Sequence, residues 1–180
     1  MAIDTIARKS DHWFKLVDVN GDGRIQHSDL QALADRTLKH FGYDKGSAKG
    51  RRLVEAYDRA WASMAEAMDA DRNEEISKEE FRSYMEQNAK KESAEKLLRP
   101  ITDAEFAAAD IDDDGLLSPS EYAKLLQSWG LSSSEAEKGA GNIDTNRDGR
   151  ISSEEYYRAC RDFFVGELTA RAGQVFGQVK

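Results

Sequence analysis

The chain has 180 residues, one cysteine and a formal net charge of −8 at pH 7. A single cysteine excludes an internal disulfide, and the acidic balance gives no sign of the basic face that nucleic-acid binding requires. No apolar run has the length of a signal peptide or a membrane span, so we expect a cytoplasmic protein without a membrane partner.

Oxygen-bearing side chains recur with one spacing in four twelve-residue stretches of the chain. They occupy positions one, three, five, nine and twelve of residues 18–29, 69–80, 110–121 and 144–155. A calcium ion takes about six to eight oxygen ligands, and this spacing lets one short loop supply them. One match could arise by chance, but four matches in one chain predict a binder of divalent cations.

The first loop ends in aspartate, where the motif usually has glutamate. Its expected ligands are Asp18, Asn20, Asp22, the carbonyl of Arg24, and Asp29. Because aspartate is one methylene shorter than glutamate, it suits the tighter octahedral geometry of Mg²⁺. We therefore expect this loop to bind Ca²⁺ with weaker selectivity and to accept Mg²⁺.

The second loop has Glu74 at the sixth position, where the sharp turn favours glycine. Its expected ligands are Asp69, Asp71, Asn73, the carbonyl of Glu75, and Glu80. A left-handed conformation costs a non-glycine residue about 1–2 kcal/mol, which corresponds to about tenfold in affinity. We expect a weaker site here, and an ordinary solvated turn is the alternative.

The third and fourth loops fit the motif at every position, including glycine at the sixth. The expected ligands of the third are Asp110, Asp112, Asp114, the carbonyl of Leu116, and Glu121. Those of the fourth are Asp144, Asn146, Asp148, the carbonyl of Arg150, and Glu155. In both loops the serine at the ninth position should also cap the following helix. Three calcium sites are expected, and four if the second loop is occupied.

Apolar residues on both sides of each loop follow the spacing of amphipathic helices. They are Trp13, Phe14, Val17, Leu30, Leu33 and Leu38 around the first loop, and Trp61, Met64, Met68, Phe81, Tyr84 and Met85 around the second. Around the third and fourth they are Phe106, Ala109, Tyr122, Leu125, Leu126, Trp129, Ala136, Ile143, Tyr156, Cys160 and Phe163. This pattern predicts an all-α fold of four helix–loop–helix units, here called hands.

The eighth residue of every loop is apolar: Ile25, Ile76, Leu117 and Ile151. In this motif the eighth residues of two loops pair through a short β-bridge. We expect the first loop to pair with the second and the third with the fourth, giving two lobes in one compact globule.

The expected organisation is an N-terminal pair at residues 1–89, a junction at 90–101, a C-terminal pair at 102–164 and an apolar tail at 165–180. Gly42, Gly46 and Gly50 predict a polar insert between helices. A helix break at Pro100 and a capping box from Thr102 to Glu105 are expected to mark the junction. The tail should pack on the lobes, because no other segment offers to cover their apolar groove.

The chain resembles the sarcoplasmic calcium-binding proteins of the EF-hand family, and among them the prokaryotic calerythrin type. The resemblance rests on four hands, a long first interval, a degenerate second loop and the run from Ile143 to Gly149 followed by Arg161–Phe164. It implies a compact closed protein that binds calcium, usually through the first, third and fourth hands, and serves as a buffer or transporter. This chain departs from the pattern by keeping every side-chain ligand in its second loop.

Two functions remain open for such a protein. A calcium buffer stays closed, whereas a sensor opens an apolar groove, often rich in methionine, and binds a protein target. The three internal methionines all lie in the second hand, which together with a tail able to occupy the groove favours a buffer. We expect the protein to be a monomer. An enzyme is not expected, because His12, His27 and His40 have no metal-ligand spacing and no nucleophile motif occurs.

Overall fold

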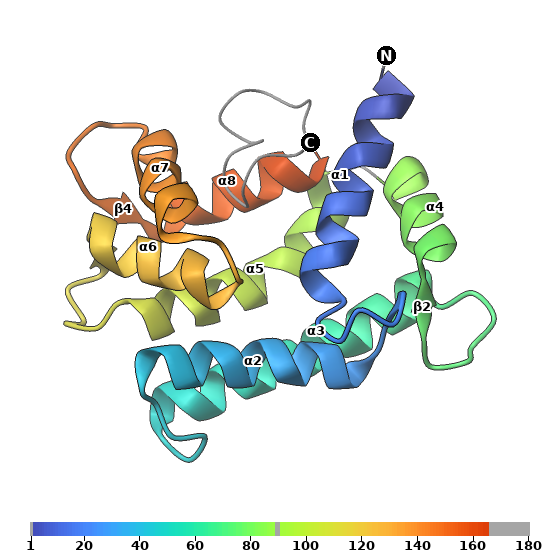
Figure 1. The fold of residues 1–180 in the computed structure, drawn as a ribbon, viewed down its shortest axis with the longest axis horizontal. Coiled ribbons are helices and arrows are strands. Elements are labelled where there is room, and N and C mark those ends of the chain that lie inside the picture. The colour runs from blue at the N-terminus through green and yellow to red at the C-terminus, as the bar shows by residue number, and fades with distance from the viewer. Residues whose placement is uncertain (1, 89–90, 166–180) are drawn as a thin grey trace.

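The computed structural model describes residues 2–88 and 91–165 (Figure 1). Within them, hand 1 consists of helices α1 (Ala2–Val17) and α2 (His27–Phe41), and hand 2 of α3 (Ala48–Met68) and α4 (Lys78–Asn88). Hand 3 consists of α5 (Lys91–Ala109) and α6 (Pro119–Ser128), and hand 4 of α7 (Ser133–Ile143) and α8 (Ser153–Val165). The expected all-α class is confirmed. None of the described helices is long and apolar enough to cross a membrane.

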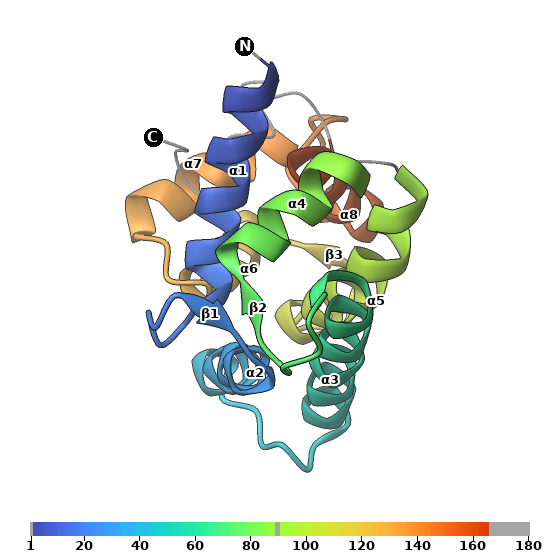
Figure 2. The same cartoon turned by 90° about the vertical axis from the view of Figure 1, so that its right-hand side faces the viewer.

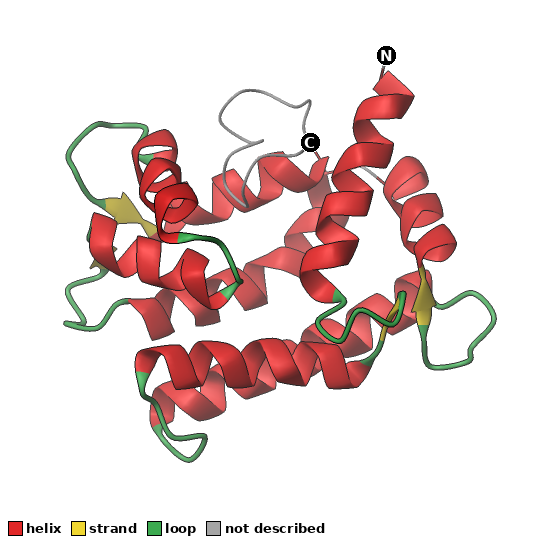
Figure 3. Cartoon of the chain, viewed as in Figure 1, coloured by secondary structure: helices red, strands yellow, loops and turns green. Residues whose placement is uncertain are grey.

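In the described part of the chain, four two-residue strands join the loops in pairs. Figure 3 shows strands in yellow. Strands β1 (Arg24–Ile25) and β2 (Ile76–Ser77) are antiparallel, with Ile25 opposite Ile76 (Figure 2). Strands β3 (Leu116–Leu117) and β4 (Ile151–Ser152) are also antiparallel, with Leu117 opposite Ile151. The expected pairing of the first loop with the second, and of the third with the fourth, is therefore confirmed. Hands 1 and 2 form the N-terminal pair, and hands 3 and 4 the C-terminal pair.

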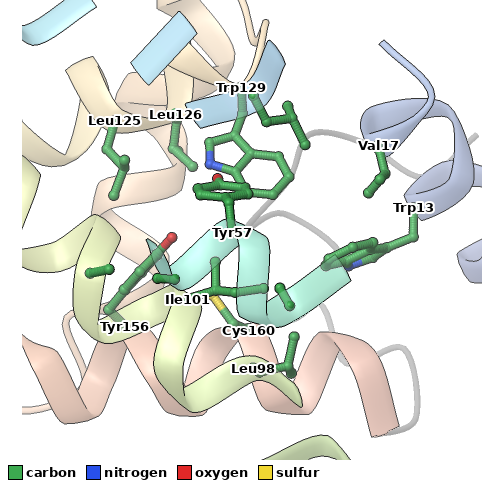
Figure 4. Packing of buried hydrophobic residues seen from close by; sticks show 14 of the residues in the cluster. Trp13, Val17, Tyr57, Leu98, Ile101, Leu125, Leu126, Trp129, Tyr156 and Cys160 are labelled. Atoms are coloured by element: carbon green, nitrogen blue, oxygen red, sulfur yellow. The ribbon is translucent and has the colours of Figure 1, made fainter. Parts of the chain in front are cut away.

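The apolar faces of the two pairs bury each other in one continuous core (Figure 4). Helix α5 of the C-terminal pair packs against α3 of the N-terminal pair on one side and against α8 on another. Trp13 of α1 meets Trp129 and Phe164 of the C-terminal pair edge to face, at ring-centroid distances of 6.1 and 5.4 Å. Each pair thus supplies the cover that the apolar stripe of the other needs.

The expectation that the tail at residues 165–180 packs on the lobes assumed that no other segment covers their apolar groove. That premise is wrong, because the two pairs cover each other. The tail itself lies outside the described residues from position 166 onward, so its packing stays untested.

The expected helix break at Pro100 and the cap at Thr102 are wrong. Helix α5 continues through Pro100, and the Thr102 hydroxyl donates to the carbonyls of Leu98 and Arg99, at 3.0 and 3.1 Å, inside the helix. An interior proline costs about 3 kcal/mol, which burial of Leu98 and Ile101 in the core offsets. The placement of the junction between the two pairs at residues 90–101 stays a prediction. Helix α5 covers most of that segment.

The expected insert after hand 1 is shorter than its glycines suggested. Residues 42–47 form the connection, and α3 begins at Ala48 with the Ser47 side chain accepting a hydrogen bond from the Gly50 N–H. Gly50 lies within the first turn of α3. The position requires glycine because a Cβ there would come 2.1 Å from the carbonyl oxygen of Asp44. The glycine allows a close backbone approach and does not mark a loop.

Candidate metal sites

The aspartate at the first position organises the backbone of every loop. One of its carboxylate oxygens accepts a hydrogen bond from the N–H of the sixth residue, and the bond length is nearly the same in all four loops. The bonds are Gly23 to Asp18 at 3.0 Å, Glu74 to Asp69 at 2.9 Å, Gly115 to Asp110 at 3.0 Å, and Gly149 to Asp144 at 3.0 Å. All four loops therefore have the same turn around the expected ion position.

The carboxylate at the twelfth position closes each loop by accepting two backbone hydrogen bonds, one from the second residue and one from the ninth. Glu121 accepts from Ile111 at 2.9 Å and from Ser118 at 2.8 Å. The Ser118 side chain also accepts from the Glu121 N–H, which confirms the expected capping box. Glu80 and Glu155 make the equivalent bonds with Ala70, Ser77, Thr145 and Ser152.

Asp29 makes the same contacts in the first loop despite its shorter side chain. It accepts from the N–H of Val19 at 3.1 Å and from that of Gln26 at 2.9 Å. Only 1% of Asp29 is exposed, against 8% for Glu121 and for Glu155. The closing carboxylate of the first loop is therefore drawn further inward.

The hydrogen bonds keep the twelfth-position glutamates ionised. Burial acts to raise the pKa of Glu155, but bonds from Ser152 and Thr145 outweigh it and lower that pKa to about 2. The same balance of burial against bonds from Ser118 and Ile111 lowers the pKa of Glu121. Ionised carboxylates are the oxygen ligands that a hard dication prefers.

Carboxylates converge in two of the loops closely enough to share one ion. In the third loop, oxygens of Asp110, Asp112 and Glu121 lie within 4.8 Å of one another. Oxygens of Asp69, Asp71 and Glu80 do the same in the second. Two ligands of one calcium ion at about 2.3–2.6 Å cannot lie more than about 5 Å apart, so both donor sets fit this cation. The first and fourth loops have asparagine at the third position, where an amide oxygen takes the place of a carboxylate.

Each loop needs two residues in the left-handed region, and sequence reasoning found only one of them. Glu74 has φ of 63° at the sixth position, which confirms the expected strain there. The fourth position is left-handed as well, with φ of 73° at Gly21, 58° at Arg72, 57° at Asp113 and 62° at Arg147. The glycine at position 21 was the available signal. The first loop therefore has glycine at both positions, whereas the second has it at neither.

Basic side chains from outside the third loop contact its acidic residues. Arg150 of the fourth loop forms an ion pair with Asp114, an expected ligand. Lys49 of α3 pairs with Asp113 at 2.8 Å and also donates to the carbonyl of Asp110. A similar ion pair joins the first two loops, between Arg24 of the first and Glu75 of the second. The Lys49 contact joins residues 61 positions apart, so no local sequence pattern could have indicated it.

The fold and the loops together define a calcium-binding protein built from two pairs of helix–loop–helix hands. A sequence profile of the EF hand matches residues 11–34, 102–126 and 142–160, which contain the first, third and fourth loops. Over 152 residues the chain is 30% identical to the probable calcium-binding protein CML16 of Oryza sativa subsp. japonica, covering 83% of this chain and 76% of the relative. The chain belongs to the EF-hand family.

Two further relatives cover nearly the whole chain. Calerythrin of Saccharopolyspora erythraea is 26% identical over 171 residues, 93% of this chain and 94% of calerythrin. A solved calcium-binding protein from Streptomyces coelicolor superimposes with a TM-score of 0.81 and 28% identity, covering 89% of this chain and 98% of that one. The resemblance to the calerythrin type is thereby confirmed, and so is the expectation that the chain is not an enzyme.

Proposed function

We propose that the protein is a calcium buffer or storage protein that remains closed while it binds and releases the ion. The observation that carries this proposal is the mutual burial of the two pairs around Trp13, Trp129 and Phe164. A sensor presents an apolar groove to its target, whereas here the apolar faces already have an intramolecular partner. An enclosed space lined by residues of both pairs measures about 10 Å³, roughly the room of one water molecule.

The proposed ligand sets are those that the loop hydrogen bonds support. We assign Ca²⁺ to the first, third and fourth loops, and a weaker fourth site to the second loop. The carboxylates that converge within 4.8 Å in the second loop support its inclusion. The penalty of two non-glycine residues in the left-handed region, Arg72 and Glu74, supports its lower affinity.

The first loop is proposed to accept Mg²⁺ because Asp29 is short. Replacing Asp29 with glutamate should raise the preference of that loop for calcium over magnesium, since a longer carboxylate can bind through two oxygens. Competition titrations of the two cations measure the ratio. Glu155→Asp in the fourth loop is the matched reverse change, and its ratio should fall. An unchanged ratio in both variants would contradict the geometric argument.

A calcium sensor is the second candidate. The solved Streptomyces coelicolor protein is described as acting in prokaryotic calcium-mediated regulation, and an analogous role here would require calcium to open the interface between the pairs. The two candidates predict different surfaces in the presence of calcium. A buffer keeps its apolar faces covered, and a sensor exposes them.

Calcium should raise the thermal midpoint of the protein without increasing the fluorescence of a hydrophobic dye. The gain in stability follows because the ion binds the folded loops and relieves repulsion among their carboxylates. Thermal unfolding and dye titration on the same samples, with and without calcium, measure both quantities. Strong dye binding that requires calcium would replace the buffer proposal with the sensor.

A further inference from the structure

A buried carboxyl group lies where the two pairs meet. Glu105 of α5 is 1% exposed and accepts hydrogen bonds from two tyrosines of two other helices. Tyr156 of α8 donates at 2.6 Å and Tyr57 of α3 also donates, while Trp129 at the end of α6 is a further group that lowers the pKa of Glu105. Figure 4 shows Tyr57, Trp129 and Tyr156 at the centre of the core. Tyr57 belongs to the N-terminal pair and the other partners to the C-terminal pair.

No basic side chain among the described residues forms an ion pair with Glu105. The groups that face it are Tyr57 from α3, Tyr122 from α6, and Tyr156 and Cys160 from α8, while Arg36 of α2 acts on Tyr57. Burial raises the pKa values of these tyrosines and of Cys160 well above their ordinary values, so all four groups stay neutral near pH 7. Glu105 is therefore the group of this cluster that changes charge near neutrality.

Two opposing effects set the proton affinity of Glu105. Burial disfavours the carboxylate and raises its pKa, whereas the hydrogen bonds from Tyr156 and Tyr57, together with Trp129, lower the pKa. Burial wins, and the pKa rises from 4.5 to about 7. Because the folded protein holds this proton more tightly than the unfolded chain, the stabilisation is complete below pH 4.5 and is lost as the pH rises through about 7.

We propose that Glu105 is a positioning residue that latches the N-terminal pair to the C-terminal pair, and that protonation of its buried carboxyl group stabilises the folded, latched state. The inference goes beyond the proposed function, because it depends on contacts in the core and holds for a buffer and a sensor alike. Helix α5 leads directly into Asp110, and Tyr156 follows Glu155. The latch thus anchors the helices that carry the first ligand of the third loop and the last ligand of the fourth.

The test is the pH dependence of unfolding for the full-length, calcium-free protein between pH 5 and 8.5. In the wild type, the shift of the Glu105 pKa to about 7 should change the unfolding equilibrium about 70-fold over this range relative to Glu105→Gln, a neutral side chain of similar shape. Burial and the charge of Lys124 lower the pKa of His40. It is present in both proteins, so the comparison cancels its effect.

The tyrosines provide a matched pair of variants for the link between the pairs. Tyr57→Phe removes one donor to the carboxylate, which should move the midpoint of the pH profile upward by about one pH unit. Tyr122→Phe removes an equally buried hydroxyl that has no hydrogen-bond partner among the described residues, and its midpoint should match the wild type.

Parallel profiles for the wild type and Glu105→Gln would overturn the proposal, because Glu105 would then not titrate in the folded protein. Equal midpoints for Tyr57→Phe and Tyr122→Phe would overturn the link to the N-terminal pair. If Glu105→Gln does not fold, the midpoints of the two tyrosine variants still test whether the contact with Tyr57 affects the titration of Glu105. The dye titration that tests the buffer is a separate measurement, so either proposal can fail alone.

Discussion

Glu121→Gln is expected to weaken calcium binding at the third loop by about 100-fold or more. Loss of an outer-shell partner of a metal ligand already costs about 10–100-fold, and this change removes the charge of a directly bound group. The side-chain shape is kept, but the single amide oxygen can accept from only one of the two N–H groups, those of Ile111 and Ser118, that the carboxylate binds. Calorimetric calcium titration of the purified variant measures the loss.

Glu135→Gln is the matched control for Glu121→Gln. Glu135 forms a capping box with Ser132 at the start of α7, as Glu121 does with Ser118 at the start of α6, but it lies outside all four loops. Both variants remove a capping carboxylate, and only one removes an expected ligand. Comparable affinity losses in the two variants would show that helix capping, and not ligation, is responsible.

The fourth loop should also bind less tightly in Glu121→Gln. Strands β3 and β4 pair Leu117 with Ile151, and Arg150 bridges from the fourth loop to Asp114 of the third. The reciprocal change, Glu155→Gln, should weaken the third loop in the same way, since coupling between two sites is mutual. Full retention of the partner site's affinity in both variants would rule out this coupling.

Glu74→Gly should strengthen the second loop about tenfold by removing a left-handed non-glycine residue. The N–H of residue 74 already donates to Asp69 at 2.9 Å, so the substitution keeps the turn and changes only its conformational cost. Calcium titrations followed through the amide protons of the sixth residues can resolve the separate loops. A second loop that stays empty in both proteins at saturating calcium would contradict the assignment of a site there.

Gly149→Glu in the fourth loop is the reverse experiment. Gly149 has φ of 80°, and a Cβ at that position would meet no atom within 4 Å. The variant therefore adds the conformational penalty without a steric clash, and it should lose about the affinity that Glu74→Gly gains. Affinity changes of the same sign, or of very different size, in the two variants would indicate that the charge of the glutamate matters more than its backbone conformation.

The loops could be predicted from the amino-acid sequence alone, because a twelve-residue turn is a local structure. The spacing of oxygen ligands, the strain at Glu74 and the cap at Ser118 each depend on residues a few positions apart. The pairing of Ile25 with Ile76 and of Leu117 with Ile151 also followed from the repeat, since each loop offers one apolar strand residue. Only the second left-handed position, Gly21 and its equivalents, was overlooked at this level.

The tertiary structure alone decided how the two pairs meet. Pro100 and Thr102 read locally as a helix end, but burial of Leu98 and Ile101 keeps α5 continuous. Glu105 was expected to belong to a capping box with Thr102, yet it lies in the core with Tyr57 and Tyr156, residues 48 and 51 positions away along the chain. Such contacts depend on side chains that folding brings together from distant segments, and no local spacing encodes them.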